Sequence, residues 1–251
     1  MNKHNFVILF LIFIISAPTK GQYPGDIWYF GEFAGLDFNT TPPTPLTDGN
    51  INSMEGCATM SDVMGNLMFY TDGVRIWNKN HEIMENGEGL VGHNSSTQGA
   101  IIVKQPGGNP YYYVFTTTYF IQQDGLCYSI VDITQNDGLG AVIEKNTQLL
   151  TPVSEKLTAI RHDNGVDYWI LAHKFYSNQF YTYLLTESGL ALNAVISITG
   201  TSHQGGQNNA IGYLRPSPSG EKLAVSIYDS GVVDVLNFNK ANGTIQLQYS
   251  L

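Results

Sequence analysis

A short pattern that recurs four times constrains the fold of this chain more than any other feature. In each copy, a strand that carries a small alanine is followed by a turn, a denser aromatic strand and further strands. The copies begin near Ala58, Ala100, Ala159 and Ala210. Internal repetition at roughly 40–55 residues, with several short strands in each copy, is typical of a β-propeller. The sequence therefore predicts an all-β fold with about four antiparallel, four-stranded blades.

The segments around the repeats agree with this prediction. Turns such as Asp72-Gly73 separate the strands, and no segment has the sustained apolar periodicity of a helix. Two aromatic strands near 27–30 and 35–38 predict an N-terminal half-blade, and the proline-rich stretch 41–45 predicts a connector, because proline cannot donate to a central ladder. The half-blade has no partner strands in the sequence. We therefore expect a WD40-like or YVTN-like propeller with an incomplete ring, and hence a fragment of a longer protein.

The N-terminus predicts export. Lys3 precedes an apolar run over residues 6–17, and small or polar residues follow it. This order is typical of a secretory signal peptide, and the run is shorter than the about 20 residues that span a membrane. We expect a signal peptide at residues 1–21 and one propeller domain at residues 22–251. The mature protein is then secreted or displayed at the cell surface and has no membrane span.

The charge of the chain argues against two classes of partner. The sequence has 12 lysines and arginines against 21 acidic residues, which gives a net charge of −9. Removal of residues 1–21 takes away two lysines and no acid, so the mature chain carries about −11. Nucleic acids bind basic grooves, and anionic lipids bind polybasic segments. We therefore expect no nucleic-acid partner and no electrostatic attachment to a membrane.

The chain contains no motif for a cofactor, a metal site or a nucleophile. His162 and His173 lie in one repeat without the spacing of a zinc site, and the turn aspartates are explained by local bonding, with calcium at an acidic turn as an alternative. Cys57 and Cys127 fall on an inner and an outer strand of successive repeats, so we expect two free thiols rather than a disulfide. We expect neither a cofactor, nor a metal, nor an identifiable catalytic residue.

Polar residues in the loops before the first strands are the best candidates for binding. Two similar loops, about 110 residues apart, each contain a histidine, and a glutamate precedes the first strand of the first and third repeats. We expect these loops to open around the mouth of a central channel. The candidate ligand-binding residues are Glu55, His93, Gln98, Glu155, His203, Gln207 and Asn208.

Each of these candidates also has a structural interpretation. The histidines can tie down their loops through contacts with the backbone or with a neighbouring blade. Glu55 and Glu155 can be a pair of carboxylates for glycoside cleavage, which requires two acids flanking the scissile bond. Alternatively, Glu155 forms a local contact such as an ion pair with Lys156, which follows it in the sequence.

Several strings of residues, taken together, resemble those of one family. They are Trp28-Tyr29-Phe30-Gly31, Glu55-Gly56-Cys57-Ala58-Thr59, Phe69-Tyr70-Thr71-Asp72-Gly73-Val74, Gly92-His93-Asn94-Ser95-Ser96, Glu155-Lys156-Leu157-Thr158-Ala159 and Asn209-Ala210-Ile211-Gly212-Tyr213. Over residues 22–251 the chain resembles the N-terminal propeller of large cell-surface proteins of Bacteroidetes, which commonly carry PKD modules and a gliding-motility-associated C-terminal sorting domain. The resemblance implies type IX secretion after export, and a role in adhesion, surface interaction or the handling of polymers. It implies no catalytic residues.

Two functional hypotheses follow. In the first, the chain is a binding or scaffold module whose partner is an extracellular glycan or a surface protein. In the second, it is an enzyme that cleaves a polysaccharide or hydrolyses a lactone at the channel mouth. An enzyme of this kind brings two acids, or a histidine and acids, within about 6–10 Å of one another. If the chain truly ends at Leu251, it lacks a sorting domain, and we expect a periplasmic protein.

Overall fold

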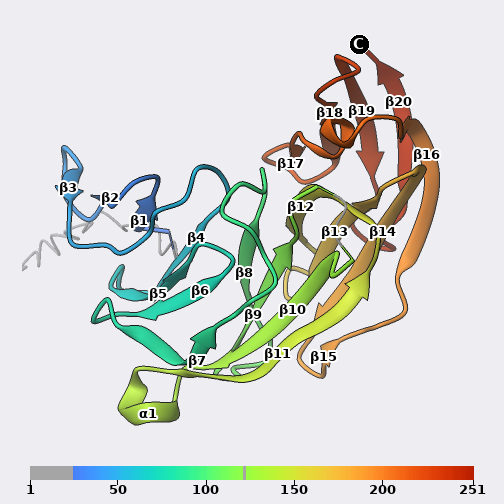
Figure 1. Ribbon diagram of the computed structural model, residues 1–251. Coiled ribbons are helices and arrows are strands. Elements are labelled where there is room, and N and C mark those ends of the chain that lie inside the picture. Colours follow the sequence, from blue (N-terminus) through green and yellow to red (C-terminus); the bar gives the residue numbers. More distant parts are fainter. Residues whose placement is uncertain (1–24, 121–122) are drawn as a thin grey trace, which may run out of the picture.

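The chain forms a series of antiparallel β-sheets that follow one another in sequence order. A computed structural model describes residues 25–120 and 123–251, so the expected signal peptide lies outside the described residues. In Figure 1 the sheets run from the blue N-terminal sheet on the left to the red C-terminal sheet at the upper right. Within the described residues, helical structure is limited to the single turns α1 (Gln135–Gly138) and η1 (Gln207–Ala210). The predicted all-β class is confirmed.

The N-terminal sheet has three strands. Their order is β1 (Ile27–Phe30), β2 (Ala34–Asp37) and β3 (Thr44–Leu46). The prediction that the proline-rich stretch is only a connector is therefore wrong at its end, because Pro45 pairs with Leu36. The pairing is possible because β3 is an edge strand, where a residue without an N–H group is tolerated.

Repeats 1 and 2 together form an eight-stranded sheet. Repeat 1 is β4 (Ala58–Ser61), β5 (Leu67–Thr71), β6 (Arg75–Asn78) and β7 (Ile83–Glu88). Repeat 2 is β8 (Ala100–Lys104), β9 (Tyr111–Thr117), β10 (Leu126–Asp132) and β11 (Ala141–Leu150). Each repeat is an antiparallel meander, and the two are joined at their last strands by a short parallel pairing at Glu85 and Ala141.

Repeats 3 and 4 form separate sheets. Repeat 3 is β12 (Val153–Arg161), β13 (Tyr168–Lys174), β14 (Ser177–Thr186), the short β15 (Gly189–Leu190) and β16 (Val195–His203). Repeat 4 is β17 (Leu214–Pro216), β18 (Lys222–Ile227), β19 (Val232–Phe238) and β20 (Ile245–Ser250). Ala210 ends η1 instead of beginning a strand, so the fourth copy of the alanine pattern departs from the first three. This departure places three backbone carbonyls where the side chain of Lys156 reaches them, as described below.

Adjacent units are held together by four apolar clusters. One cluster lies between each successive pair, from the N-terminal sheet to repeat 4, and is made of residues from the facing strands of both units. The first strands also contact one another in order, β1 with β4, β4 with β8, β8 with β12, and β12 with β17. In Figure 1, β4, β8, β12 and β17 lie in the middle of the view and the last strands lie outside them. The first strands therefore share one central region.

Side-chain hydroxyl groups join strands of neighbouring units. On β16, Ser197 Oγ accepts a hydrogen bond from the backbone N–H of Ile245 at 2.9 Å, and Thr199 Oγ1 accepts one from Leu247 at 2.9 Å. The same arrangement occurs at the other end of the molecule, where Ser61 and Thr59 on β4 accept hydrogen bonds from backbone N–H groups of β1. Hydroxyl groups at alternating strand positions thus accept hydrogen bonds from backbone N–H groups of the next unit, which would otherwise lack a partner.

Replacement of Phe115 by alanine tests the packing between repeats 2 and 3. Phe115 is fully buried in the cluster that these two repeats share. The Phe115→Ala variant should lose about 3–5 kcal/mol of the free energy of unfolding, because a large apolar side chain is replaced by a cavity. Urea denaturation gives this value. The control is Ile143→Ala on the exposed side of β11, with an expected change within about 0.5 kcal/mol. Equal effects of the two substitutions would contradict the packing.

Candidate functional site

A cleft lies over the central region where the first strands meet. It consists of two cavities, of about 370 and 420 Å³, which share the lining residues Glu55, Thr97 and Tyr213. The smaller cavity is lined by residues of β4, β8 and β17 and by the loops before them, and the larger one extends along repeat 4 to Tyr228. We call these two cavities together the axial cleft. Two of the seven predicted residues, Glu55 and Gln98, line it directly.

Glu155 lies behind the cleft and is fully buried on β12. Its Oε2 accepts hydrogen bonds from the backbone N–H and the hydroxyl of Thr97, both at 2.9 Å, and its Oε1 accepts one from the backbone N–H of Phe120 at 2.8 Å. Both carboxylate oxygens are therefore engaged. Glu155 fixes two loops of repeat 2 onto repeat 3, which is the structural interpretation of this residue.

Gln98 is buried and connects three repeats. It lies in the loop before β8, and its Oε1 accepts hydrogen bonds from the backbone N–H of Leu214, at 2.6 Å, and of Leu157, at 3.3 Å. Its amide group donates to the carbonyl oxygen of Leu214 at 3.3 Å. One side chain of repeat 2 thus pairs with the first strands of repeats 3 and 4, as another strand would. Gln98 therefore has a structural role, and its binding role stays a prediction.

Lys156 completes this buried polar network. Its Nζ donates to the carbonyl oxygens of Ala210 at 2.8 Å, Ile211 at 2.9 Å and Asn209 at 3.4 Å, at the end of η1. Three acceptors match the three donors of a charged ammonium group. Burial lowers the pKa of Lys156 to about 7, and the charge of Glu155 opposes this effect. The expected ion pair of Glu155 with Lys156 is therefore not the main contact of either side chain.

Glu55 and His93 lie in two loops that are joined by backbone hydrogen bonds from Met54 and Glu55 to the carbonyl oxygen of Asn94. Glu55 is exposed, and its pKa is raised by partial burial and next by the negative charge of Glu155, while the Thr97 hydroxyl and His93 oppose the shift. The ring of His93 stacks on Tyr119 with ring centroids 4.7 Å apart, and its Nδ1 accepts a hydrogen bond from the backbone N–H of Ser95. The sequence correctly predicts that these loops meet. His93 also ties down its own loop.

His203 does not belong to the cleft. It is fully buried at the end of β16 and stacks on His173 of β13, with ring centroids 3.5 Å apart. Its Nδ1 lies 3.3 Å from Ser154 Oγ, whereas its Nε2 and both ring nitrogens of His173 have no hydrogen-bond partner among the described residues. Burial, together with the nearby Lys156 charge, lowers the pKa of His173 to about 3, and burial followed by His173 and Lys156 lowers the pKa of His203 further. Both rings are therefore neutral in the folded protein.

Gln207 and Asn208 are exposed on η1 and are not among the residues that line the two cavities. In their place, repeat 4 contributes Tyr213, Arg215 and Tyr228, which sequence reasoning missed. Tyr213 and Tyr228 are 46% and 66% exposed, and the Arg215 guanidinium lies 5.1 Å from the centre of the Tyr213 ring. The sequence places these tyrosines in or next to strands, where most aromatic residues pack into a core, so it contains no signal of their exposure.

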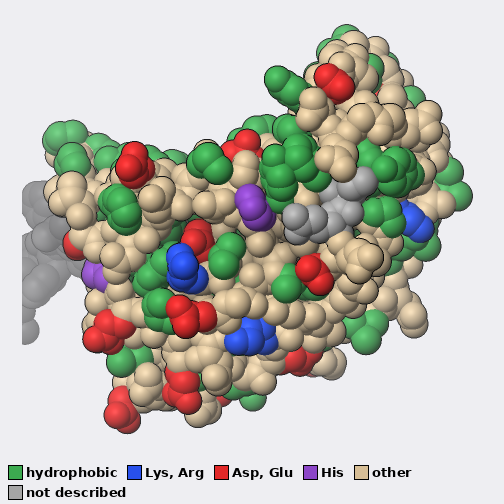
Figure 2. Space-filling view, in the orientation of Figure 1, with side chains coloured by type: hydrophobic (Ala, Val, Ile, Leu, Met, Phe, Trp, Pro, Cys, Tyr) green, Lys and Arg blue, Asp and Glu red, His purple; other side chains and the backbone are tan. Residues whose placement is uncertain are grey.

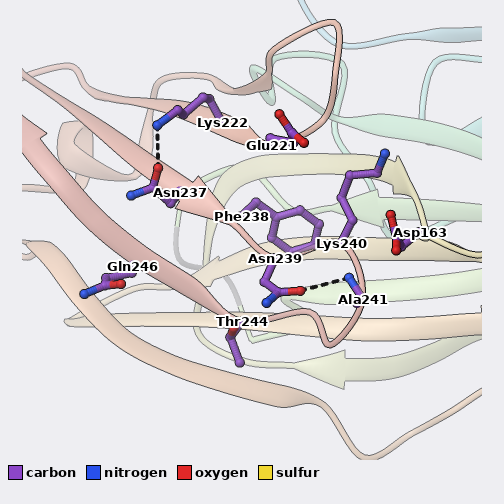
Figure 3. A pocket seen from close by; sticks show the side chains of 10 residues that line it. All are labelled: Asp163, Glu221, Lys222, Asn237, Phe238, Asn239, Lys240, Ala241, Thr244 and Gln246. Carbon is purple, nitrogen blue, oxygen red and sulfur yellow. Dashed lines mark hydrogen bonds between the residues drawn. The ribbon is translucent and has the colours of Figure 1, made fainter.

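A larger and more polar cavity, of about 640 Å³, lies at the far end of repeat 4. Figure 3 shows Lys222 and Asn237 on one side of it and Asp163 and Lys240 on the other. Lys222 donates to Asn237 and to Gln248, and Asn239 accepts from the backbone of Ala241. These contacts within repeat 4 engage several of the polar groups that line the cavity. The axial cleft, with its exposed aromatic rings, is the better candidate for a binding site.

Several other expectations concern metals, thiols and membranes. Cys57 and Cys127 are both free, as predicted. Within residues 25–120 and 123–251, no group of three or more histidine, cysteine or acidic side chains is placed to hold a metal ion. Over the same part of the chain, none of the helices has the length and apolar character needed to cross a membrane.

No protein-family model matches the chain, and no curated protein matches it.

Replacement of Glu155 tests whether this carboxylate is structural. The Glu155→Gln variant loses the charge and presents an amide group to backbone donors, so it should lose about 2–3 kcal/mol of the free energy of unfolding. The control is Glu55→Gln, which removes an exposed carboxylate and should change this value by less than about 0.5 kcal/mol. Urea denaturation of both variants gives the comparison. A Glu155→Gln variant as stable as Glu55→Gln would show that the three hydrogen bonds contribute little.

The buried histidine pair predicts a loss of stability in acid. Histidine has an ordinary pKa of 6.5, whereas the pKa of His173 in the folded protein is about 3. Between these values the unfolded state binds more protons than the folded state, so stability falls as the pH decreases from 6.5 toward 3. Each histidine contributes about 1.4 kcal/mol per pH unit.

The contribution of one histidine can be isolated with His173→Phe, which keeps an aromatic ring next to Phe180. The difference in the free energy of unfolding between wild type and variant is measured by urea denaturation at several pH values. It should change by about 1.4 kcal/mol per pH unit, which corresponds to one proton. An unchanged pH dependence would mean that His173 is protonated in the folded protein.

Proposed function

We propose that this chain is an exported β-propeller module that acts at the cell surface and binds an extracellular polymer in the axial cleft. The ordered contacts of the first strands and the apolar cluster between each pair of units support a propeller arrangement. The N-terminal sequence supports export, and the resemblance to the Bacteroidetes surface proteins supports secretion through the type IX system. The family, the destination and the partner belong to this proposal.

The axial cleft is the observation that carries the binding function. Its exposed residues combine the flat faces of Tyr213 and Tyr228 with a carboxylate at Glu55 and a guanidinium at Arg215. Aromatic rings with one apolar face and a polar edge stack well on sugar rings, while charged and hydroxyl groups bind the sugar substituents. Because the two cavities share Tyr213, an extended glycan can occupy both at once.

The geometry favours binding over glycoside cleavage. Cleavage requires two carboxyl groups that both reach the glycosidic bond or a water molecule beside it. Glu55 is exposed at the cleft, but both oxygens of Glu155 are engaged by Thr97 and Phe120. Glu155 therefore positions the wall of the cleft, and Glu55 is left without a second carboxylate for acid–base chemistry at the bond.

A glycan array with the purified protein tests the proposed function. We expect retention of at least one extracellular polysaccharide, and we expect Tyr213→Ala to weaken its binding about tenfold, as measured by titration calorimetry. The control variant is Tyr249→Ala, which removes a similarly exposed tyrosine on β20 and should leave binding unchanged. Failure to retain any polymer, or equal effects of the two variants, would argue against a glycan site in the axial cleft.

A further inference from the structure

We infer that the ligand of the axial cleft is a glycan that contains a free amino sugar, with its ammonium group directed at Glu55. This inference rests on the proposed function and specifies the class of polymer. It follows from the charges near the junction of the two cavities and from the aromatic surfaces beside it.

Two carboxylates lie near Thr97, where the two cavities meet: Glu55 lines the cleft and Glu155 is buried behind it, and neither has a hydrogen-bonded cation among the described residues. Glu155 is held by one hydroxyl and two backbone N–H groups, and the ammonium group of Lys156 donates to carbonyl oxygens at the end of η1. The only contact within 4.0 Å between a basic and an acidic side chain in the described part of the chain joins His81 and Asp48, neither of which lines the cleft. The pKa of Glu55 is raised first by its partial burial and next by the negative charge of Glu155, so the two carboxylates repel each other across Thr97. A cation that binds beside Glu55 relieves this repulsion.

The aromatic surfaces next to Glu55 suit a cation as well. The Tyr213 ring already has the guanidinium of Arg215 at 5.1 Å from its centre, so it serves as a platform for positive charge. Tyr228, which is more exposed, lines the same cavity as Glu55 and Tyr213. A carboxylate beside exposed tyrosine rings is a favourable site for an ammonium group.

The overall charge of the molecule also favours a cationic ligand. The chain has a net charge of −9, and Figure 2 shows acidic side chains spread over the face that it presents, with basic side chains at fewer places. An excess of negative charge draws cationic ligands toward the surface.

The lining of the cleft favours a sugar over a basic peptide. A lysine-rich peptide would require several carboxylates in a row, whereas Glu55 is the single acidic residue among the described residues that line the two cavities, and Arg215 lies in one of them. The remaining exposed or half-buried polar side chains of the lining carry hydroxyls, at Thr59, Ser226 and the two tyrosines. Hydroxyl groups and flat rings complement the hydroxyls and faces of sugar rings.

Titration calorimetry with the hexamers of glucosamine and of N-acetylglucosamine tests this inference. The two ligands have the same backbone, and acetylation removes the positive charges. The wild-type protein should bind the glucosamine hexamer about tenfold more tightly in mildly acidic buffer, and added salt should reduce the difference. Glu55→Gln should remove most of this preference, whereas Glu85→Gln, at an exposed position on β7, should retain it. Circular dichroism of each variant shows whether it is folded.

The outcomes separate this inference from the proposed function. Equal affinity for the two hexamers, or a preference that survives Glu55→Gln, would overturn the inference while a glycan-binding cleft remains. Tighter binding of polylysine than of the glucosamine hexamer, lost in Glu55→Gln, would overturn the sugar class in favour of a basic protein partner. If neither hexamer binds and the glycan array retains nothing, the proposed function itself is contradicted.

Discussion

The arrangement of the sheets depends on the polar side chains at the start of β12. Successive side chains of a strand point to opposite faces, so Glu155 and Lys156 reach in opposite directions from adjacent positions. Glu155 binds the two loops of repeat 2, and Lys156 binds the end of η1 ahead of repeat 4. Gln98 adds backbone-like hydrogen bonds from repeat 2 to the first strands of repeats 3 and 4. Three neighbouring units are therefore tied together at one point.

This network explains how two ionisable side chains, Glu155 and Lys156, are both fully buried. Burial of a carboxylate or an ammonium group is costly unless its hydrogen bonds are satisfied, and here each has three partners. A fully satisfied polar network favours one arrangement of the loops over others, which apolar packing alone does less well. One of these loops carries Thr97 to the cleft, and the segment after η1 carries Tyr213. The loop that carries Glu55 is joined to the Thr97 loop by a hydrogen bond from the backbone N–H of Gly56 to the carbonyl oxygen of Ser96. The buried network and the exposed residues of the cleft are thus positioned by the same set of connected loops.

The repeats and most strands could be predicted from the sequence, because turn residues and apolar alternation act over a few positions. The sequence also indicates that the loops before the first strands meet, since those loops occupy equivalent places in the repeats. Whether a polar residue in such a loop faces solvent depends on partners far along the chain. Gln98, for example, contacts Leu214, more than 100 residues away, and His203 is buried by His173 on another strand. Local patterns contain no information on such contacts, so the binding and structural roles of these residues could not be separated.

The aromatic part of the cleft was missed for a related reason. Tyr213 and Tyr228 occur at the first and second strands of repeat 4, where aromatic residues usually pack against the next sheet. Ala210 differs from the alanines of the other repeats because η1 replaces the beginning of a strand, and Gly212, with φ of 129°, follows it. This irregular segment precedes Tyr213 directly, and Tyr213 is exposed. Departures from a repeat are therefore as informative about a site as the repeat itself.

Amide hydrogen exchange in a Gln98→Leu variant tests the central claim, namely that one buried network couples repeats 2, 3 and 4. The substitution keeps the volume of the side chain and removes its hydrogen bonds to Leu157 and Leu214. The account predicts faster exchange in peptides from the first strands of repeats 3 and 4, distant in sequence from the substitution, while β5–β7 of repeat 1 keep their protection. Faster exchange confined to the loop around residue 98 would contradict it.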